Sequence, residues 1–297
     1  MKRIKINENQ FNMLFERIIV FENLDERTFL FANDVSETLL YETRGVPNSI
    51  NVVTSSLLSR IKDKINNEVF NETLEIGGLF DGWSITFTAS RDFYGMNGVT
   101  QEYKKNVEIA FNIDENNNFD ECNVSNLIGH ELMHVFQYYV GSNSIMKNKT
   151  KSEMYEIMND VFNLYSNNKI ICSLNYIIYY SFIEEQEAYT VGGKEYFNNF
   201  DDKKIIDYDS YYSFISSSPF YLAFQRLKEG KEILENYRLY KDIIDWFCSL
   251  YKIKYEDFVK VLNNSIFSLK YKFKRVLADF FIDNDISADD RKKFMFI

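Results

Sequence analysis

The segment His130-Glu131-Leu132-Met133-His134 constrains the fold more than any other feature, because it holds both histidines of the chain. Residues four apart share one face of an α-helix, so a helix here would turn both imidazoles toward a single metal ion. Two imidazoles alone rarely complete a metal site. The spacing therefore predicts a helix, together with a second segment that brings a further ligand to the same face.

The composition is that of a globular chain. Hydrophobic residues make up 45% of the 297 residues and aromatic residues 17%, which excludes a disordered chain and allows a full core. The formal net charge is −10, and no concentrated basic stripe is present. Nucleic-acid binding is therefore disfavoured.

Cysteine content and hydropathy predict the location of the protein. Three cysteines without C-x-x-C spacing argue against a disulfide framework and fit a reducing compartment. The N-terminus has no apolar signal-peptide core, and the most apolar run, Leu174 to Ile183, is too short to span a bilayer. We expect a cytoplasmic protein without membrane insertion, or a virion-associated one if a phage encodes it. The oligomeric state stays open.

Two strands are predicted ahead of the motif. Residues 83–88 and 107–113 alternate apolar and β-branched residues with polar ones, and a long connection with Gly95 and Gly98 joins them. The predicted class is α+β: mainly helical, with a small sheet before the motif helix and a helical C-terminal half. The predicted regions are 1–75 (N-terminal, helical), 76–193 (the core with the motif) and 194–297 (C-terminal, helical), or one domain throughout.

Helical spacing predicts most of the remaining elements. Asp120 or Asn123 is the expected N-cap of the motif helix and Gly141 its end. Pro219 fits a helix N1 position and Gly230 a C-cap. Gly192-Gly193 fits the end of the helix that contains Glu185. The other predicted helices are 8–21, 50–69, 152–166, 173–191, 219–229, 232–250 and 255–282.

The missing metal ligand must be acidic, because no third histidine exists. A catalytic zinc usually takes three protein ligands and leaves one position for water, and a carboxylate is the alternative to imidazole. The candidates are Glu153, Glu156, Glu184, Glu185, Glu187 and, less favourably, the thiolate of Cys122.

Resemblances to known His-His-Glu enzymes, the gluzincins, rank these candidates. Glu153 stands at a spacing typical of aminopeptidase-type gluzincins, and Glu156 precedes Asp160 as in thermolysin-like enzymes. Glu185 precedes Ala188 as in the Glu-x-x-Ala segment of other gluzincins, including CAAX-processing proteases. The small alanine would let the two ligand helices approach closely, so Glu185 is the favoured ligand.

The two segments together resemble a broad group of zinc metallopeptidases of bacteria and their phages. Their pattern is H-E-L-x-H-x-x-Q followed by E-x-E-A, which residues 130–137 and 185–188 match. The resemblance covers only Leu127 to Gly193, under a quarter of the chain. Related families often have Asp in place of Tyr189, where it holds a ligand histidine. The corresponding partner in this chain stays unidentified.

The resemblance implies a zincin-like core in which Zn²⁺ is held by His130, His134 and Glu185. Glu131 would act as general base on a water whose pKa the zinc lowers. The expected function is a zinc metallopeptidase that hydrolyses a peptide or protein substrate. The alternative is a zinc-binding but non-proteolytic structural, virion or effector protein of the same fold. In a third interpretation the motif is accidental in a helical interaction protein.

The walls of the expected cleft are less defined. Tyr189, Tyr211, Tyr212 and Arg226 are candidates for stabilising an oxyanion. The strand from Asn106 to Ile113 is a candidate sheet edge along which an extended peptide would lie, or else an ordinary buried strand.

Overall fold

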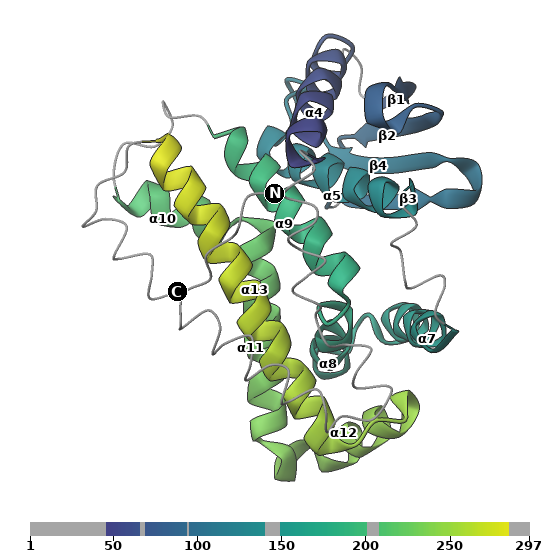
Figure 1. Cartoon of the computed structure of the whole chain (residues 1–297), viewed down its shortest axis with the longest axis vertical. Helices are drawn as coiled ribbons and strands as arrows, with labels where there is room; N and C mark the ends of the chain where they lie inside the picture. Colours follow the sequence, from purple (N-terminus) through teal and green to yellow (C-terminus); the bar gives the residue numbers. More distant parts are fainter. Residues whose placement is uncertain (1–45, 66–68, 94, 140–148, 201–207, 285–297) are drawn as a thin grey trace, which may run out of the picture.

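A computed structural model describes residues 46–65, 69–93, 95–139, 149–200 and 208–284, and it shows a mainly helical chain with one small sheet (Figure 1). The predicted α+β class is confirmed at this level. The predicted helix at 8–21 and the helix end at Gly141 lie outside the described residues.

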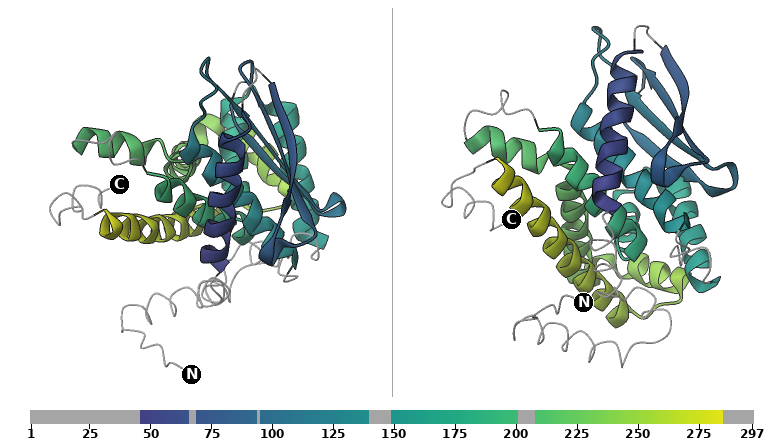
Figure 2. Two further views of the ribbon diagram at one scale, coloured as in Figure 1. Left: turned by 90° about the horizontal axis from the view of Figure 1, so that it is seen from above. Right: turned by 45° about the horizontal axis from the view of Figure 1, so that its top comes forward.

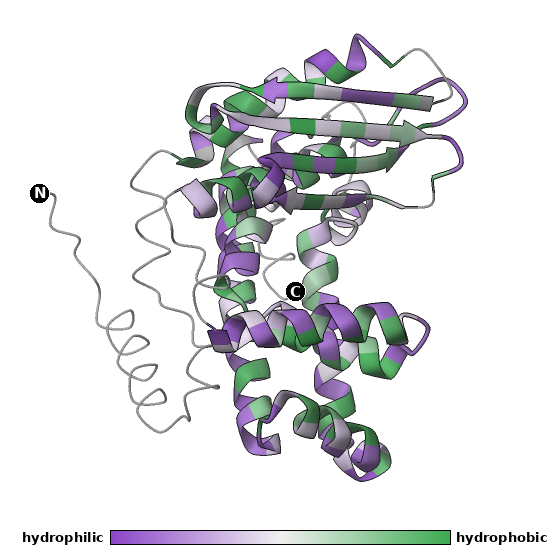
Figure 3. Cartoon of the chain, turned by 90° about the vertical axis from the view of Figure 1, so that its right-hand side faces the viewer, coloured by the Kyte–Doolittle hydropathy of each residue, from purple (hydrophilic) through white to green (hydrophobic). Residues whose placement is uncertain are grey.

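The sheet is mixed, with the strand order β1-β2-β4-β3. β1 (Val69–Ile76) runs antiparallel to β2 (Trp83–Ser90), β2 runs parallel to β4 (Asn106–Asn112), and β3 (Asn97–Gln101) runs antiparallel to β4. Along β2, every second side chain from Trp83 onward is buried, and those between are partly exposed. This alternation gives the sheet one apolar face; Figure 3 shows the strands with the opposite face toward the viewer.

β2 and β4 confirm the two predicted strands, but β1 and β3 correct the prediction. The predicted helix at 50–69 ends earlier, as α4 (Val46–Lys62), and leaves room for β1. β3 lies in a segment that was predicted as a connection. Its sequence has no strand signal, because Val99 is its one large apolar residue and is 42% exposed. β4 lies between β2 and β3, so of the two interpretations of residues 106–113 the structure contradicts the sheet edge and supports the ordinary interior strand. β3 is the edge strand on that side.

The apolar face of the sheet is covered by α4 and α5 (Glu121–Tyr139), as Figure 2 shows. Ile50 of α4 and Ile128 and Leu132 of α5 are fully buried with Phe87 of β2 and Phe111 of β4. Each such side chain contributes about 1.5–3 kcal/mol by its removal from water. This sheet-side core places the motif helix directly behind β3 and β4.

A second core belongs to the helices of the C-terminal half. Tyr180, Phe247, Tyr251 and Phe258 are among its largest buried side chains. None of the helices in the described ranges is long and apolar enough to cross a membrane. The elements around this core are α7 (Lys149–Tyr165), α8 (Lys169–Tyr179), α10 (Tyr208–Ser216), α11 (Pro219–Glu235), α12 (Tyr237–Tyr251) and α13 (Tyr255–Asp283).

The helix α9 (Ile183–Asn198) belongs to both cores. Its Ala188 and Val191 pack in the sheet-side core, whereas its Tyr196 and Phe197 pack among the C-terminal helices. The predicted helix at 173–191 is therefore two helices, α8 and α9, separated by residues 180–182. The predicted division into three regions stays a prediction.

Three glycines lie at helix crossings, and the prediction that they end helices is wrong. Gly192 and Gly193 lie inside α9; a Cβ on Gly192 would come within 2.7 Å of the carbonyl oxygen of Asn126 in α5. Gly230 lies inside α11, where a Cβ would come within 2.8 Å of Ile177 in α8. Gly192 and Gly230 use the missing side chain for close approach, whereas a Cβ on Gly193 would meet Phe220 of α11 at an ordinary 3.5 Å. Pro219 does begin α11, as predicted.

Candidate metal centre

The motif helix α5 carries its two histidines on the face that meets α9. Asp120 caps this helix, because its side chain accepts a hydrogen bond from the backbone N–H of Asn123. Asp120 is thus the one of the two predicted caps that the structure uses. The rings of His130 and His134 follow at helical spacing and lie edge to face, with their centroids 4.9 Å apart.

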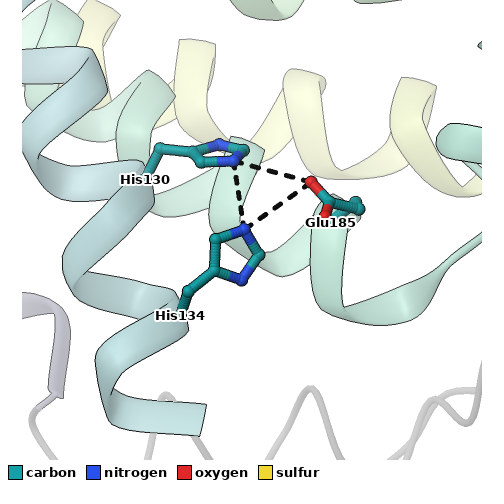
Figure 4. A group of neighbouring side chains, drawn as sticks. All are labelled: His130, His134 and Glu185. Carbon is teal, nitrogen blue, oxygen red and sulfur yellow. Dashed lines mark hydrogen bonds and ion pairs between the residues drawn. The ribbon is translucent and has the colours of Figure 1, made fainter. Parts of the chain in front are cut away.

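Glu185 joins the two histidines to make a group of three possible ligands (Figure 4). Its Oε2 lies 3.5 Å from Nε2 of His130 and 3.6 Å from Nε2 of His134. The two Nε2 atoms are 3.2 Å apart. Donor atoms bound tetrahedrally to one zinc ion are separated by roughly 3.4 Å, since each lies about 2.0–2.2 Å from the metal. The three side chains therefore have the spacing that one such ion requires.

The group is buried and electrostatically coupled. Burial is the largest single influence on His134 and lowers its pKa, but the charge and hydrogen bond of Glu185, with Glu131 and Gln137, together outweigh burial and raise that pKa to about 9. Burial would raise the pKa of Glu185, but the adjacent His134 and His130 hold it well below its ordinary value. Glu185 Oε2 is buried without a hydrogen-bond partner among the described residues. A buried carboxylate oxygen aimed between two imidazoles suits the coordination of a cation.

Gln137 orients one of the candidate ligands. Its Oε1 lies 2.8 Å from Nδ1 of His134, so an N–H at Nδ1 can donate to it and leave Nε2 free for a metal. The amide of Gln137 in turn donates to the carbonyl oxygen of Glu184 and to Oε2 of Glu187 in α9. Gln137 thus takes the role expected of an Asp at position 189. Its place three residues after His134 in the motif was the available signal.

Glu131 lies beside the group without belonging to it. Thr100 of β3 donates a hydrogen bond from Oγ1 to Oε2 of Glu131 at 2.7 Å. A Cβ on Gly98 of the same strand would come within 2.7 Å of Oε1. The glycine therefore makes room for the carboxylate, and the threonine holds it. The charge of Glu131 also acts to raise the pKa of His134, which places it close to the candidate ligands.

A cavity of about 330 Å³ opens onto this site. On one side it is bounded by β3, the residue before it and α5, and on the other by aromatic side chains of the C-terminal half. The combination of a carboxylate, an imidazole and an arginine in one cavity is suited to binding and polarising a small polar group. The lining residues are Met96, Asn97, Gly98, Asn126, Leu127, His130, Glu131, Phe162, Tyr176, Tyr179, Tyr189 and Arg226.

Of the four predicted oxyanion donors, Tyr189 and Arg226 line the cavity. Tyr189 lies edge-on to His130, with ring centroids 4.8 Å apart. Tyr211 and Tyr212 are in α10 and do not line it; Tyr211 stacks on Phe200 instead.

Tyr155 of α7 is a donor that sequence reasoning missed. The charge of Glu185 and burial raise its pKa well above the ordinary value, so its hydroxyl keeps its proton. Among 21 tyrosines, no sequence signal distinguishes this one.

The other ligand candidates lie outside the group of three. Glu153 contacts Lys149 at 4.0 Å, and Glu156 is exposed on α7. Glu184 pairs with Lys151 at 3.2 Å. Glu187 accepts the hydrogen bond from Gln137, and the thiol of Cys122 donates to the carbonyl oxygen of Asn199.

A scan against protein-family models and searches of curated proteins and of solved structures found no match to this chain.

Proposed function

We propose that the chain is a zinc-dependent metallopeptidase with a zincin-like arrangement, in which His130, His134 and Glu185 hold the ion. The observation that carries the proposal is the spacing of 3.2–3.6 Å among three buried donor atoms, beside a carboxylate that is not one of them. Two imidazoles and one carboxylate form a donor set that zinc favours. Bound zinc lowers the pKa of a water molecule and polarises a carbonyl group.

The residues around the ion divide the remaining work. Glu131 takes a proton from the attacking water and later delivers it to the leaving amine. Thr100 and the space at Gly98 fix the orientation of Glu131. Gln137 keeps Nε2 of His134 turned toward the ion. Tyr189, which lines the cavity beside His130, would donate a hydrogen bond to the developing oxyanion, and Tyr155, next to Glu185, is the second candidate donor.

A peptide is the substrate that the surroundings favour. β3 is the edge strand beside the cavity, and its Asn97 and Gly98 line it. An extended peptide could add to such an edge by backbone hydrogen bonds, with its scissile bond next to Glu131. A purely structural zinc site is disfavoured, because such sites are closed by four protein ligands, whereas the described residues offer a group of three, of which His130 lines a cavity.

Metal content and hydrolysis together test the proposal. The purified protein should contain about one zinc per chain and release new amino groups from a random-sequence peptide library. Glu131→Gln should lose roughly a hundred- to ten-thousandfold in rate, because the base is gone, and should retain its zinc. Glu156→Gln, on the exposed face of α7, is the matched control and should keep both. Full hydrolysis by Glu131→Gln, or protein without zinc, would contradict the proposal.

A further inference from the structure

Arg226 of α11 is the one arginine or lysine that lines the cavity, as far as the described residues go. Its guanidinium lies over the ring of Tyr176, 4.4 Å from the centroid, and its Nη1 donates a hydrogen bond to the hydroxyl of Tyr180 at 3.0 Å. These two contacts hold the planar group in place. It is partly buried and shares the cavity with His130 and Glu131.

No acidic side chain in the described ranges pairs with this arginine, although the chain has 44 acidic residues and 34 basic ones. A partly buried charge without a counter-charge is costly. A guanidinium carries five N–H donors, and Arg226 uses one of them in a hydrogen bond to Tyr180. The remaining donors suit a carboxylate, which the guanidinium can bind through two parallel hydrogen bonds.

Tyrosine rings set the distance between Arg226 and the metal ligands. Tyr189 packs on His130 with ring centroids 4.8 Å apart, and Tyr180 packs on Tyr189 with centroids 5.2 Å apart. The two tyrosine hydroxyls are 3.4 Å apart. Tyr189 and Tyr180 thus form a chain of contacts from His130 to Arg226, and His130 and Arg226 line the same cavity. An extended peptide advances about 3.3 Å per residue, so a carboxylate at Arg226 would lie a few residues from the scissile bond.

We propose that Arg226 binds a carboxylate of the substrate and so selects peptides that carry one a few residues from the cleaved bond. This inference rests on the proposed peptidase function. The carboxylate belongs either to the C-terminus of the peptide or to an Asp or Glu side chain, which offer the same chemistry. Arg226 is then a specificity-determining residue, with Tyr176 and Tyr180 as the groups that position it.

Three peptide libraries separate the two sources. The first is a random-sequence library without Asp and Glu that ends in a free carboxylate, and the second is the same library ending in a carboxamide. The third ends in a carboxamide and contains Asp and Glu. Initial rates at low substrate concentration report kcat/KM. We expect about tenfold faster cleavage of the first or the third library than of the second, the size expected of one charge-assisted hydrogen bond.

Variants of Arg226 test whether this residue is the cause. Arg226→Gln should cleave the three libraries at equal rates, and Arg226→Lys should keep part of the preference, because a lysine retains the charge but loses the planar fork. Arg238→Gln, exposed on α12, is the matched control and should keep all of it. Equal rates with the unmodified protein, or a preference that survives Arg226→Gln, would overturn the inference.

Binding distinguishes failure of this inference from failure of the proposed function. If the unmodified protein cleaves none of the libraries, the proposed function fails. Retention of the same libraries by zinc-loaded Glu131→Gln protein, measured by mass spectrometry, then tests Arg226 alone. Enrichment of carboxylate-bearing peptides that disappears in the double variant with Arg226→Gln would support the site. Absence of enrichment would reject it.

Discussion

The two walls of the cavity differ in chemistry. The sheet-side wall, formed by β3 with the residue before it and by α5, contributes Gly98, His130 and Glu131, which are small or reactive. The helical-side wall, formed by α7, α8, α9 and α11, contributes aromatic rings and one guanidinium, that of Arg226. The proposed reaction groups thus lie on one rigid helix and its adjacent strand, and the groups that would recognise a substrate lie opposite. The exception is Glu185, which crosses from the helical side to complete the metal group.

Removal of the Glu185 carboxylate, the one proposed ligand from the helical side, should have the largest effect. Glu185→Ala should lower zinc affinity by roughly a hundred- to a thousandfold, because apparent zinc-binding energies of about 10–16 kcal/mol are shared by about four ligands. Glu156→Ala, on neighbouring α7, should leave it unchanged. Competition with a chromogenic chelator measures both. Loss of zinc from Glu156→Ala alone would assign the third ligand to α7.

Glu195, on the same helix as Glu185, should affect stability instead of zinc. Burial raises its pKa to about 7, although the hydrogen bond from Asn51 and the charge of Lys194 act to lower it. Between about pH 4.5 and about pH 7 this carboxyl ionises in the unfolded chain but stays protonated in the folded one. The free energy of unfolding therefore falls as the pH rises through this range.

Glu195→Gln should remove this loss, since it has no proton to release. At pH 8 the variant should be more stable than the unmodified protein by at most about 3 kcal/mol, and at pH 4.5 the two should be nearly equal. Urea unfolding at both pH values measures the difference, and zinc content is the control. An equal gap at pH 4.5 and pH 8 would contradict the prediction.

A substitution on the sheet-side wall should impair turnover without removing zinc. The methyl group of Gly98→Ala would come within 2.7 Å of Glu131 Oε1 and push the proposed base aside. We expect kcat to fall by roughly ten- to a hundredfold, because a base out of place loses much of its contribution. Gly77→Ala is the matched control, since no atom lies within 4 Å of its Cβ position. Unchanged turnover in Gly98→Ala would show that Glu131 does not act from this position.

The smallest expected effect concerns the hydrogen-bonded link between the two walls. Gln137→Met keeps the volume of the side chain but removes the acceptor at His134 and the donor to Glu187. Zinc affinity should fall about tenfold, as for other residues that orient a metal-bound histidine. Glu187→Gln keeps an acceptor and should cost less. Isothermal titration of zinc into the metal-free proteins gives both values, and a larger loss in Glu187→Gln would reverse their order of importance.

The sequence predicted those site residues that lie close together along the chain. His130 and His134 meet because residues four apart on a helix must share a face, and the structure brings them together as expected. Glu185 required a resemblance as well, because spacing along the chain does not determine where two helices cross. The crossing depends on Gly192, which the sequence presents only as a helix breaker. Its role becomes visible once Asn126 of α5 is seen against it.

The groups that stayed unpredicted act through contacts distant in sequence. Thr100 reaches Glu131 across 31 positions, from a strand with too few apolar residues to predict. Tyr155 comes close to Glu185 because α7, which packs on α8, meets the first turn of α9, where Lys151 pairs with Glu184. Nothing in the neighbours of Tyr155 along the chain indicates this. The division into two cores could not be predicted either, because α9 is continuous in sequence but contributes side chains to both cores.

The membership of α9 in both cores has a consequence for assembly of the molecule. His130 and His134 belong to the sheet-side half, whereas Glu185 stands at the end of α9 that emerges from the helical half. An ion held by all three would fasten one half to the other across the intervening fifty positions. An ion that binds only when the two halves are together stabilises the folded chain, so the unfolding temperature would rise with zinc concentration. The same ion would then have a structural role in addition to its proposed catalytic one.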